Sequence, residues 1–199
     1  MDFVGVRDHE PVTVDDQERE AAVLAPVIDR ESGSHILFTK RAEHLSDHPG
    51  QMSFPGGGRE PEDDSLEATA KREGNEEIGL RPEEVSIVGR LDDIRTITRY
   101  SVRPFVAEIP DRTYEPYDGE VAELAILPVS ALIDRENYQS EHREHPHYGE
   151  IRLHYFYVDG YTVWGATARM LVQLLELATD WTVPPEPDRE VGPDADYPV

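Results

Sequence analysis

The order of hydrophobic and polar positions along this chain predicts a protein built mainly from strands. Residues 21–30 and 35–41 are two apolar runs with a short polar turn between them, which is typical of two buried strands in succession. Pro104 lies inside another such run and indicates an edge strand or a bulge, because proline has no backbone N–H to donate. The other strands are expected at residues 85–91, 102–110, 123–126 and 151–159.

Two helices are expected in the second half of the chain, one before and one after the strand at residues 151–159. One begins at Ser130, and another near the end of the chain carries Leu171, Leu174 and Leu175 on one side. This apolar stripe is typical of an amphipathic helix that packs on a sheet.

A more polar helix is predicted in the middle of the chain, up to about residue 78. Asp64 is expected to cap its first turn, and Glu67, three residues later, completes a pattern like a capping box. Gly79 is expected to end the helix.

One side of this central helix changes character along its length. On a helical wheel, Glu67, Lys71 and Asn75 lie on the outer side, and the other side begins with small apolar residues and continues with acidic ones. Like charges at this spacing repel one another, and partial burial increases the cost. A divalent cation removes the conflict, and carboxylate oxygens suit Mg²⁺ or Mn²⁺. The inward-facing set is Leu66, Thr69, Ala70, Glu73, Glu76 and Glu77.

The alternative interpretation is one more acidic helix in an acidic chain. The fixed spacing of glycines, helix cap and Arg72-Glu73 favours the metal site. The segment resembles the Nudix box, with Asp64 where most members have Glu, and Gly74 where a larger apolar residue is usual. A mid-helix glycine costs about 1 kcal/mol relative to alanine. The positions that carry the resemblance are Gly58, Asp64, Arg72-Glu73, Glu76-Glu77, Gly79 and Leu80.

Two flanking segments resemble motifs of the coenzyme A pyrophosphatases of that family. The first precedes the box. In that subfamily the loop after the paired glycines tends to be one residue longer. Asp63 therefore competes with Asp64 for the position of the first acidic residue of the box. The second is the segment 163–171. The matching residues of the first motif are Thr39, Arg41, His48, Gly50, Phe54, Pro55, Gly56 and Gly57.

The resemblance implies an α/β (α+β) fold, the Nudix α/β/α sandwich with a mixed central β-sheet. It covers most of the chain, so we expect a Nudix domain at residues 21–181. Residues 1–20 are expected to be a short helix or a mobile arm, and the proline-rich, acidic residues 182–199 a mobile tail.

The resemblance also implies a set of site residues. Glu73, Glu76 and Glu77 would hold one or more Mg²⁺ or Mn²⁺ ions, and Arg72 would hold these carboxylates or Asp64 in register. Glu77 and Glu120 are both candidates for the group that takes a proton from water.

Substrate contacts are expected upstream of the box. Arg41 and Lys40 are cations in a chain with few of them, and arginine suits phosphate recognition, although Arg41 pairing with a surface carboxylate is the alternative. Phe54 belongs to the same motif and is therefore also expected to contact the substrate. Gly56 and Gly57, with Gly58, would allow an unusual backbone turn and leave the cleft free of side chains.

The predicted reaction is metal-dependent hydrolysis of coenzyme A or acyl-coenzyme A to 3′,5′-adenosine diphosphate and (acyl-)4′-phosphopantetheine. An alternative keeps the chemistry and changes the substrate to ADP-ribose, NADH or another nucleoside diphosphate derivative. A non-enzymatic alternative is a nucleotide-binding regulatory module. The intact Glu73, Glu76 and Glu77 weigh against that module, because a site without catalysis would not retain three costly carboxylates.

The amino-acid composition limits the classes of partner that this chain is expected to bind. Lys+Arg 19 against Asp+Glu 42 gives a net charge of −23, which argues against nucleic acid or an anionic membrane and leaves a small-molecule nucleotide, with a homodimer possible. Such an acidic, lysine-poor chain resembles proteins of salt-loving organisms, because the Debye length falls to about 3 Å in molar salt. The alternative is an ordinary acidic protein. There is no cysteine, and with no signal-peptide pattern or long apolar run we expect a cytoplasmic protein.

Several other polar residues are weaker candidates. His142, His145 and His147 lack helical ligand spacing, so a solvated hairpin tip is expected there. His48, beside a proline, is expected to be a turn residue. Glu123 is a candidate metal ligand or base, and Arg95, Arg99 and Tyr100 are candidate nucleotide contacts. For each of these residues the alternative is a solvent-exposed position without such a role.

Overall fold

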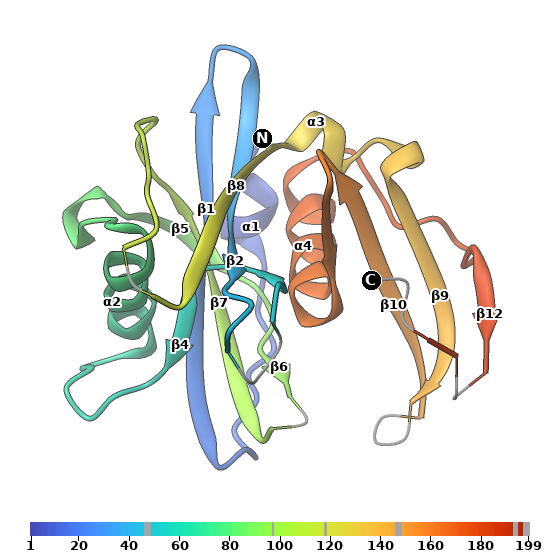
Figure 1. Cartoon of the computed structure of the whole chain (residues 1–199), viewed down its shortest axis with the longest axis horizontal. Coiled ribbons are helices and arrows are strands. Elements are labelled where there is room, and N and C mark those ends of the chain that lie inside the picture. The colour runs from blue at the N-terminus through green and yellow to red at the C-terminus, as the bar shows by residue number, and fades with distance from the viewer. Residues whose placement is uncertain (46–48, 97, 118, 146–148, 193–194, 197–199) are drawn as a thin grey trace.

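Two sheets and the helices between and beside them make up the fold (Figure 1). The computed structural model describes residues 1–45, 49–96, 98–117, 119–145, 149–192 and 195–196. The large sheet contains β1 (Arg19–Arg30), β2 (Gly33–Arg41), β3 (Met52–Ser53), β4 (Gly56–Gly58), β5 (Ser86–Arg90), β6 (Ile94–Arg95), β7 (Tyr100–Glu108) and β8 (Val121–Pro128). The small sheet contains β9 (Tyr138–His145), β10 (Gly149–Val158), β11 (Tyr161–Trp164) and β12 (Arg189–Val191).

The large sheet is mixed. β1 pairs in parallel with β7 along one edge, and antiparallel with β4 and then β2 along the other. The apolar runs predicted at residues 21–30 and 35–41 are therefore neighbouring strands, as expected. The helices are α1 (Val4–Asp8), α2 (Leu66–Ile78), α3 (Val129–Leu132) and α4 (Gly165–Ala178), with 3₁₀ turns η1 (Pro82–Glu84) and η2 (Arg135–Asn137).

Two apolar cores explain the layering. One core lies under α2, where Leu66, Ala70 and Ile78 pack against residues of the large sheet such as Leu24. The other lies on the opposite face, between that sheet and α1 and α4. The α/β/α sandwich with a mixed central sheet is confirmed.

The small sheet is the part of the architecture that the sequence pattern did not predict. The run 151–159 was expected as one more strand, and it forms β10 in a separate sheet of order β11-β10-β9-β12. α4 lies between the two sheets (Figure 1) and contacts β10 and β11. Its predicted stripe of Leu171, Leu174 and Leu175 is fully buried there.

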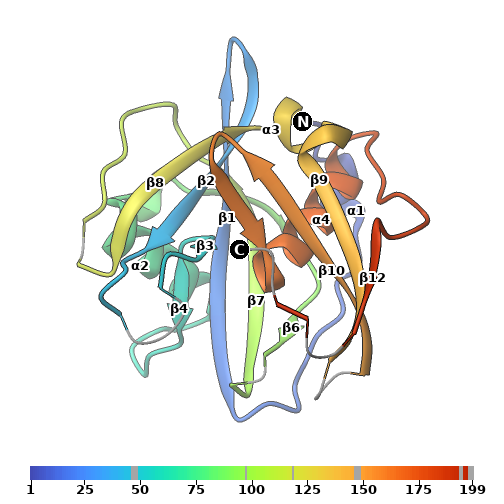
Figure 2. The same ribbon diagram turned by 45° about the vertical axis from the view of Figure 1, so that its right-hand side comes forward.

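The prediction of a mobile tail at residues 182–199 is wrong for the part that the structure describes. β12 pairs in parallel with β9 (Figure 2), and Arg143 donates to the backbone carbonyls of Ala195 and Asp196. Asp188 also accepts from the backbone N–H of Ser140. Backbone pairing and buried arginine contacts therefore attach this segment to the small sheet.

The prediction for residues 1–20 also needs correction. A short helix is present there, at α1, and its Val6 is buried. The following segment is tied to the loop after β5: the backbone N–H of Val14 donates to Asp93, whose N–H donates to the carbonyl of Val12. These contacts fix the segment, so it is not a mobile arm in this structure.

Pro104 is not in an edge strand. β7 has β1 along one side, while on the other side its partner changes from β6 at Val102 to β5 at Phe105. Pro104 lies at this change of partner, where its missing N–H costs little. No helix in the described part of the chain is both long and apolar enough to span a lipid bilayer.

Candidate active site

The helix α2 begins one residue later than its sequence indicated. The N-cap is Ser65, whose side chain accepts from the backbone N–H of Ala68. The predicted cap at Asp64 is therefore wrong, and so is the capping-box role of Glu67, which instead binds Lys71 at 2.7 Å. Gly79 ends the helix in the left-handed conformation, at φ 63°, as predicted.

Asp63 takes the structural position for which Asp63 and Asp64 competed. Its side chain is 5% exposed and accepts from Arg72 Nε at 3.1 Å, from Thr69 Oγ1 at 2.9 Å and from the N–H of Glu60 at 2.9 Å. The Arg72 hydrogen bond is the main reason why the pKa of Asp63 is lowered to about 2, against the opposing effect of burial. Asp63 is therefore a buried anion that fixes the loop before α2.

Arg72 joins this loop to the catalytic face of the helix. Besides Asp63, its guanidinium donates to the carbonyl of Gly58 at 2.9 Å, and its NH1 lies 2.9 Å from both Glu73 Oε1 and Glu76 Oε2. One cation is thus shared by three carboxylates, which matches the register-holding role expected of Arg72.

Glu73 lies deepest of the acidic residues on this face. Its side chain is 15% exposed, and burial raises its pKa in spite of the nearby Arg72. A Cβ on Gly57 would lie 2.4 Å from Glu73 Oε1, so a residue with a side chain at position 57 would displace this carboxylate.

Close approach, and not an unusual turn, explains the glycines that precede α2. Residues 56–58 form strand β4 against β1, and none of them has a positive φ. A Cβ on Gly56 would lie 2.4 Å from the carbonyl oxygen of Ala22. The predicted turn is therefore wrong, while the predicted absence of side chains at this point is confirmed.

The three glutamates do not share one inward-facing position. Glu76 is 52% exposed and reaches Arg72, whereas Oε2 of Glu77 is buried. Within the residues that the structure describes, no three acidic or histidine side chains converge on a point that could hold an ion. The expectation that all three carboxylates point inward is therefore wrong for Glu76, because its side chain is half exposed and is bridged to Glu73 by the Arg72 guanidinium.

The donor chemistry of this face nevertheless fits a divalent cation. Asp63, Glu73 and Glu76 share a single guanidinium, so the cluster carries more negative than positive charge, and burial disfavours the charged form of Glu73. A bound cation would supply the missing charge to oxygen ligands one helical turn apart.

The upstream cations lie at the end of β2 and are paired with β8. Arg41 NH1 lies 3.3 Å from Glu120 Oε2, and Lys40 Nζ lies 3.8 Å from Glu123 Oε2. Both arginine and lysine side chains are 34% exposed. The structure thus places all four charged groups together, with Glu123 also accepting from the hydroxyl of Tyr161.

Phe54 lies beneath this surface. Its ring is buried and stacks on Phe38, with 5.1 Å between the ring centroids. The core position of Phe54 explains its place in the motif, and a substrate contact by its side chain has no support here.

The two flanking motifs meet in space although more than 100 residues separate them in the sequence. β11 contacts β3, and a Cβ on Gly165 would lie 3.6 Å from the side-chain nitrogen of Gln51. The two segments therefore lie against each other in the fold. His48 lies outside the described residues.

The weaker candidates are placed elsewhere. Arg95 pairs with Asp16, Arg99 pairs with Glu18, and His142 lies near Glu190. His147 and the side chain of His145 lie outside the described part, so the histidine metal site gains no support. The tip of the predicted hairpin lies outside the described residues, while Glu141 and Arg143, in the strand β9 that leads to it, are buried.

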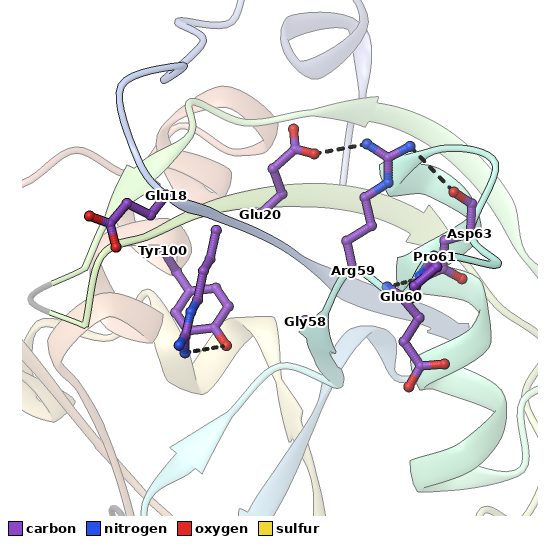
Figure 3. A pocket seen from close by; sticks show the side chains of 9 residues that line it. Glu18, Glu20, Gly58, Arg59, Glu60, Pro61, Asp63 and Tyr100 are labelled. Atoms are coloured by element: carbon purple, nitrogen blue, oxygen red, sulfur yellow. Dashed lines mark hydrogen bonds and ion pairs between the residues drawn. The ribbon is translucent and has the colours of Figure 1, made fainter.

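A cavity of about 450 Å³, which the sequence did not indicate, lies at the start of β1 and β7 (Figure 3). Tyr100 and Glu18 lie on one side, Glu60 and Asp63 on the other, and Gly58 lies between them. Tyr100, which the sequence offered both as a nucleotide contact and as a solvated loop residue, lines this cavity and is the one signal of it that was available in the sequence.

Comparison with known proteins places this chain among similar sequences. A sequence profile of the NUDIX domain matches residues 18–148. The "Uncharacterized Nudix hydrolase NudL" of Enterobacter sp. (strain 638) is 39% identical over 160 residues, covering 78% of this chain and 81% of that protein. The protein of the same name from Cronobacter sakazakii (strain ATCC BAA-894) is 37% identical, covering 79% and 81%.

Solved structures give a more distant likeness. The NUDIX domain of Shewanella oneidensis NrtR, complexed with ADP ribose, has a TM-score of 0.48 and 17% identity, covering 62% of this chain and 80% of that chain.

Proposed function

Because this chain belongs to the Nudix hydrolase family and is a pyrophosphohydrolase of nucleoside diphosphate derivatives, we propose that its substrate is coenzyme A or an acyl-coenzyme A. The products are 3′,5′-adenosine diphosphate and 4′-phosphopantetheine or its acylated form. Water attacks one phosphorus of the diphosphate, the bridging P–O bond breaks, and the other phosphate leaves with the bridging oxygen.

The cluster around Arg72, which has more negative than positive charge, is the observation that supports the hydrolytic part of this proposal. Nudix hydrolases use divalent metals, and we assign Mg²⁺ or Mn²⁺ to Glu73, Glu76 and Glu77. Such an ion neutralises phosphate charge and lowers the pKa of water. Arg72 keeps α2 and the loop at Asp63 together, and Gly57 leaves room beside Glu73. Glu77 and Glu120 remain the two candidates for the group that accepts a proton from the attacking water.

The choice of coenzyme A rests on the flanking motifs and on Arg41. The two motifs contact each other through β3 and β11, and Arg41 and Lys40, at the end of the neighbouring strand β2, each have 34% of the side chain exposed. Coenzyme A carries a 3′-phosphate that ADP-ribose and NADH lack. We propose that Arg41 exchanges Glu120 for this phosphate, because a guanidinium binds phosphate in two-point contact.

A comparison of coenzyme A with 3′-dephospho-coenzyme A tests this assignment. The wild type should have a kcat/KM about tenfold higher on coenzyme A, and Arg41→Ala should lose that preference. Arg30→Ala is the matched control, since Arg30 pairs with Asp111 at the opposite end of the β1–β2 hairpin. Faster hydrolysis of ADP-ribose or NADH than of coenzyme A would contradict the proposal.

The same assay tests the salt adaptation that the net charge of −23 suggests. We propose that the acidic surface suits molar salt, where repulsion between exposed carboxylates is screened. Activity with Mg²⁺ or Mn²⁺ should therefore be retained or rise between low and molar KCl. A steep fall would indicate an ordinary acidic protein.

A further inference from the structure

The cavity beside β4 has no role in the function proposed above. It is formed by the first residues of β1 and β7 and by the loop that leads from β4 to α2. Figure 3 shows Gly58 at its centre, with Tyr100 on one side and Glu60 on the other. The guanidinium of Arg19 lies 5.5 Å from the centroid of the Tyr100 ring, so an aromatic surface and a cation border the space together.

The cavity is continuous with the catalytic cluster. Two of its lining residues, Gly58 and Asp63, bind Arg72 directly. Gly57, next to Gly58 in β4, lies against Glu73, since a Cβ there would be 2.4 Å from Glu73 Oε1. A molecule whose diphosphate lies at Glu73 would therefore reach this cavity with the groups attached to one end of the diphosphate.

The charges of the lining select against a further phosphate. The lining has carboxylates from Glu18, Glu20, Glu60 and Asp63 but guanidinium groups from Arg19 and Arg59 alone. Several of the carboxylates are also paired, as in Glu20 with Arg59 at 2.8 Å. Because Arg59 already binds Glu20, and Arg99 and Arg72 bind Glu18 and Asp63, the lining offers a further dianion little positive charge, whereas its carboxylate oxygens accept hydrogen bonds from hydroxyl and amide N–H groups.

The sheet topology separates this cavity from Arg41. β7 lies along one edge of β1, and β4 and β2 lie along the other. Tyr100 pairs with Arg19 at the first edge, while Arg41 is at the end of β2 beyond the second. The cavity and the proposed 3′-phosphate site are therefore on opposite sides of β4, as the two halves of a diphosphate-linked substrate would be.

We propose that this cavity binds the pantetheine arm of the substrate, an inference that rests on the proposed function. The arm is uncharged, has a hydroxyl group and two amides, and carries a dimethyl group that can pack on the Tyr100 ring. Its amide N–H and hydroxyl groups donate to carboxylates such as Glu60, and its carbonyl groups accept from Arg19. The phosphorylated adenosine then lies on the Arg41 side of β4.

Gly58 keeps the centre of the cavity open. A Cβ on this residue would lie 3.8 Å from Tyr100 Cε1, which is an ordinary contact distance, and its φ is not positive. A larger side chain is therefore compatible with the backbone and would extend towards Tyr100. Gly58→Val fills the cavity without removing the Gly58 carbonyl that Arg72 uses.

Product inhibition by the two halves of the substrate tests the proposal. In Tyr100→Ala and Gly58→Val, the inhibition constant of 4′-phosphopantetheine should rise about tenfold, while that of 3′,5′-adenosine diphosphate should change less than about threefold. Arg41→Ala should give the reverse pattern. Thermal unfolding of each variant shows whether it still folds. Tyr100→Ala removes an aromatic ring whereas Gly58→Val fills space, so an effect that both variants share points to the cavity itself.

Two outcomes would overturn the inference. Equal weakening of both products by the cavity variants would indicate a general structural effect, and selective weakening of 3′,5′-adenosine diphosphate would place the nucleoside in the cavity. Direct calorimetric titration with pantetheine separates this inference from the proposed function. If the wild type fails to hydrolyse coenzyme A but binds pantetheine in a Tyr100-dependent way, the proposed function fails and the cavity assignment stands; absence of both overturns both.

Discussion

Two clusters of arginine and carboxylate side chains in this protein have opposite charge balance. At the start of α2, the single guanidinium of Arg72 serves Asp63, Glu73 and Glu76. In the small sheet, the single carboxylate of Glu141 accepts from Arg143, Arg189 and the hydroxyl of Tyr155. The first cluster is short of positive charge, and the second provides its buried carboxylate with a partner on each oxygen.

Burial sharpens this difference. Glu141 and Arg143 are 1% and 3% exposed, so their network lies in the interior and joins β9 to β12. Around Arg72, Glu73 is partly buried while Glu76 is half exposed. A satisfied buried network holds a fold together, whereas an incompletely neutralised one at the surface can accept a cation and a phosphate. Charge balance therefore distinguishes the buried cluster of the small sheet from the partly exposed cluster at α2, which is the one we propose to bind the metal.

The largest effect is expected from Glu73→Gln, which removes charge from the functional cluster. kcat with Mg²⁺ should fall about 1000-fold, because a metal ligand and its charge are lost. The midpoint of thermal unfolding should stay unchanged or rise, since burial disfavours the charged form of Glu73. Glu67→Gln, on the outer side of the same helix, is the control and should keep its activity. Comparable kcat values for the two variants would disprove the assignment of Glu73.

Glu141→Gln should produce the opposite pair of results. The free energy of unfolding in urea should fall by about 3 kcal/mol, because Arg143 would remain buried without its counter-charge. kcat of the folded enzyme should not change. Glu150→Gln, whose side chain is 78% exposed on the neighbouring strand, is the control. A stability loss no larger than that of the control would show that the network is not structural.

The smallest effect is expected at Gly74, inside α2. A Cβ there would lie 3.6 Å from side-chain atoms of Leu24 and Leu80, which is an ordinary contact. Gly74→Ala should therefore stabilise the protein by about 1 kcal/mol through helix propensity. Urea unfolding measures this gain. A loss of stability would show that the core under α2 has no room for a methyl group.

Local patterns predicted the elements better than the contacts between them. The strands at residues 21–30 and 35–41, the helix end at Gly79 and the apolar stripe of α4 follow from spacing along the chain. The fixed offsets of Arg72, Glu73 and Gly57 likewise indicated which residues would gather at α2.

Interactions over long sequence separations account for what was missed. Glu141 and Arg189 are 48 residues apart, and nothing near either residue indicates that they meet. The attached C-terminal segment and the small sheet follow from such pairs. The role of Asp63 depended on the loop path before Ser65, and the position of Glu76 depended on which carboxylates Arg72 could reach. Spacing alone determines neither.

The short strand β12 also has a consequence for association between copies of this protein. Without it, β9 would offer a row of free backbone N–H and C=O groups to any passing strand, which is how sheets of separate molecules join into aggregates. Residues 189–191 occupy that row from within the same chain. This segment therefore keeps residues 141–143 of the small sheet from pairing with a strand of another molecule, at a place far from α2 in the sequence.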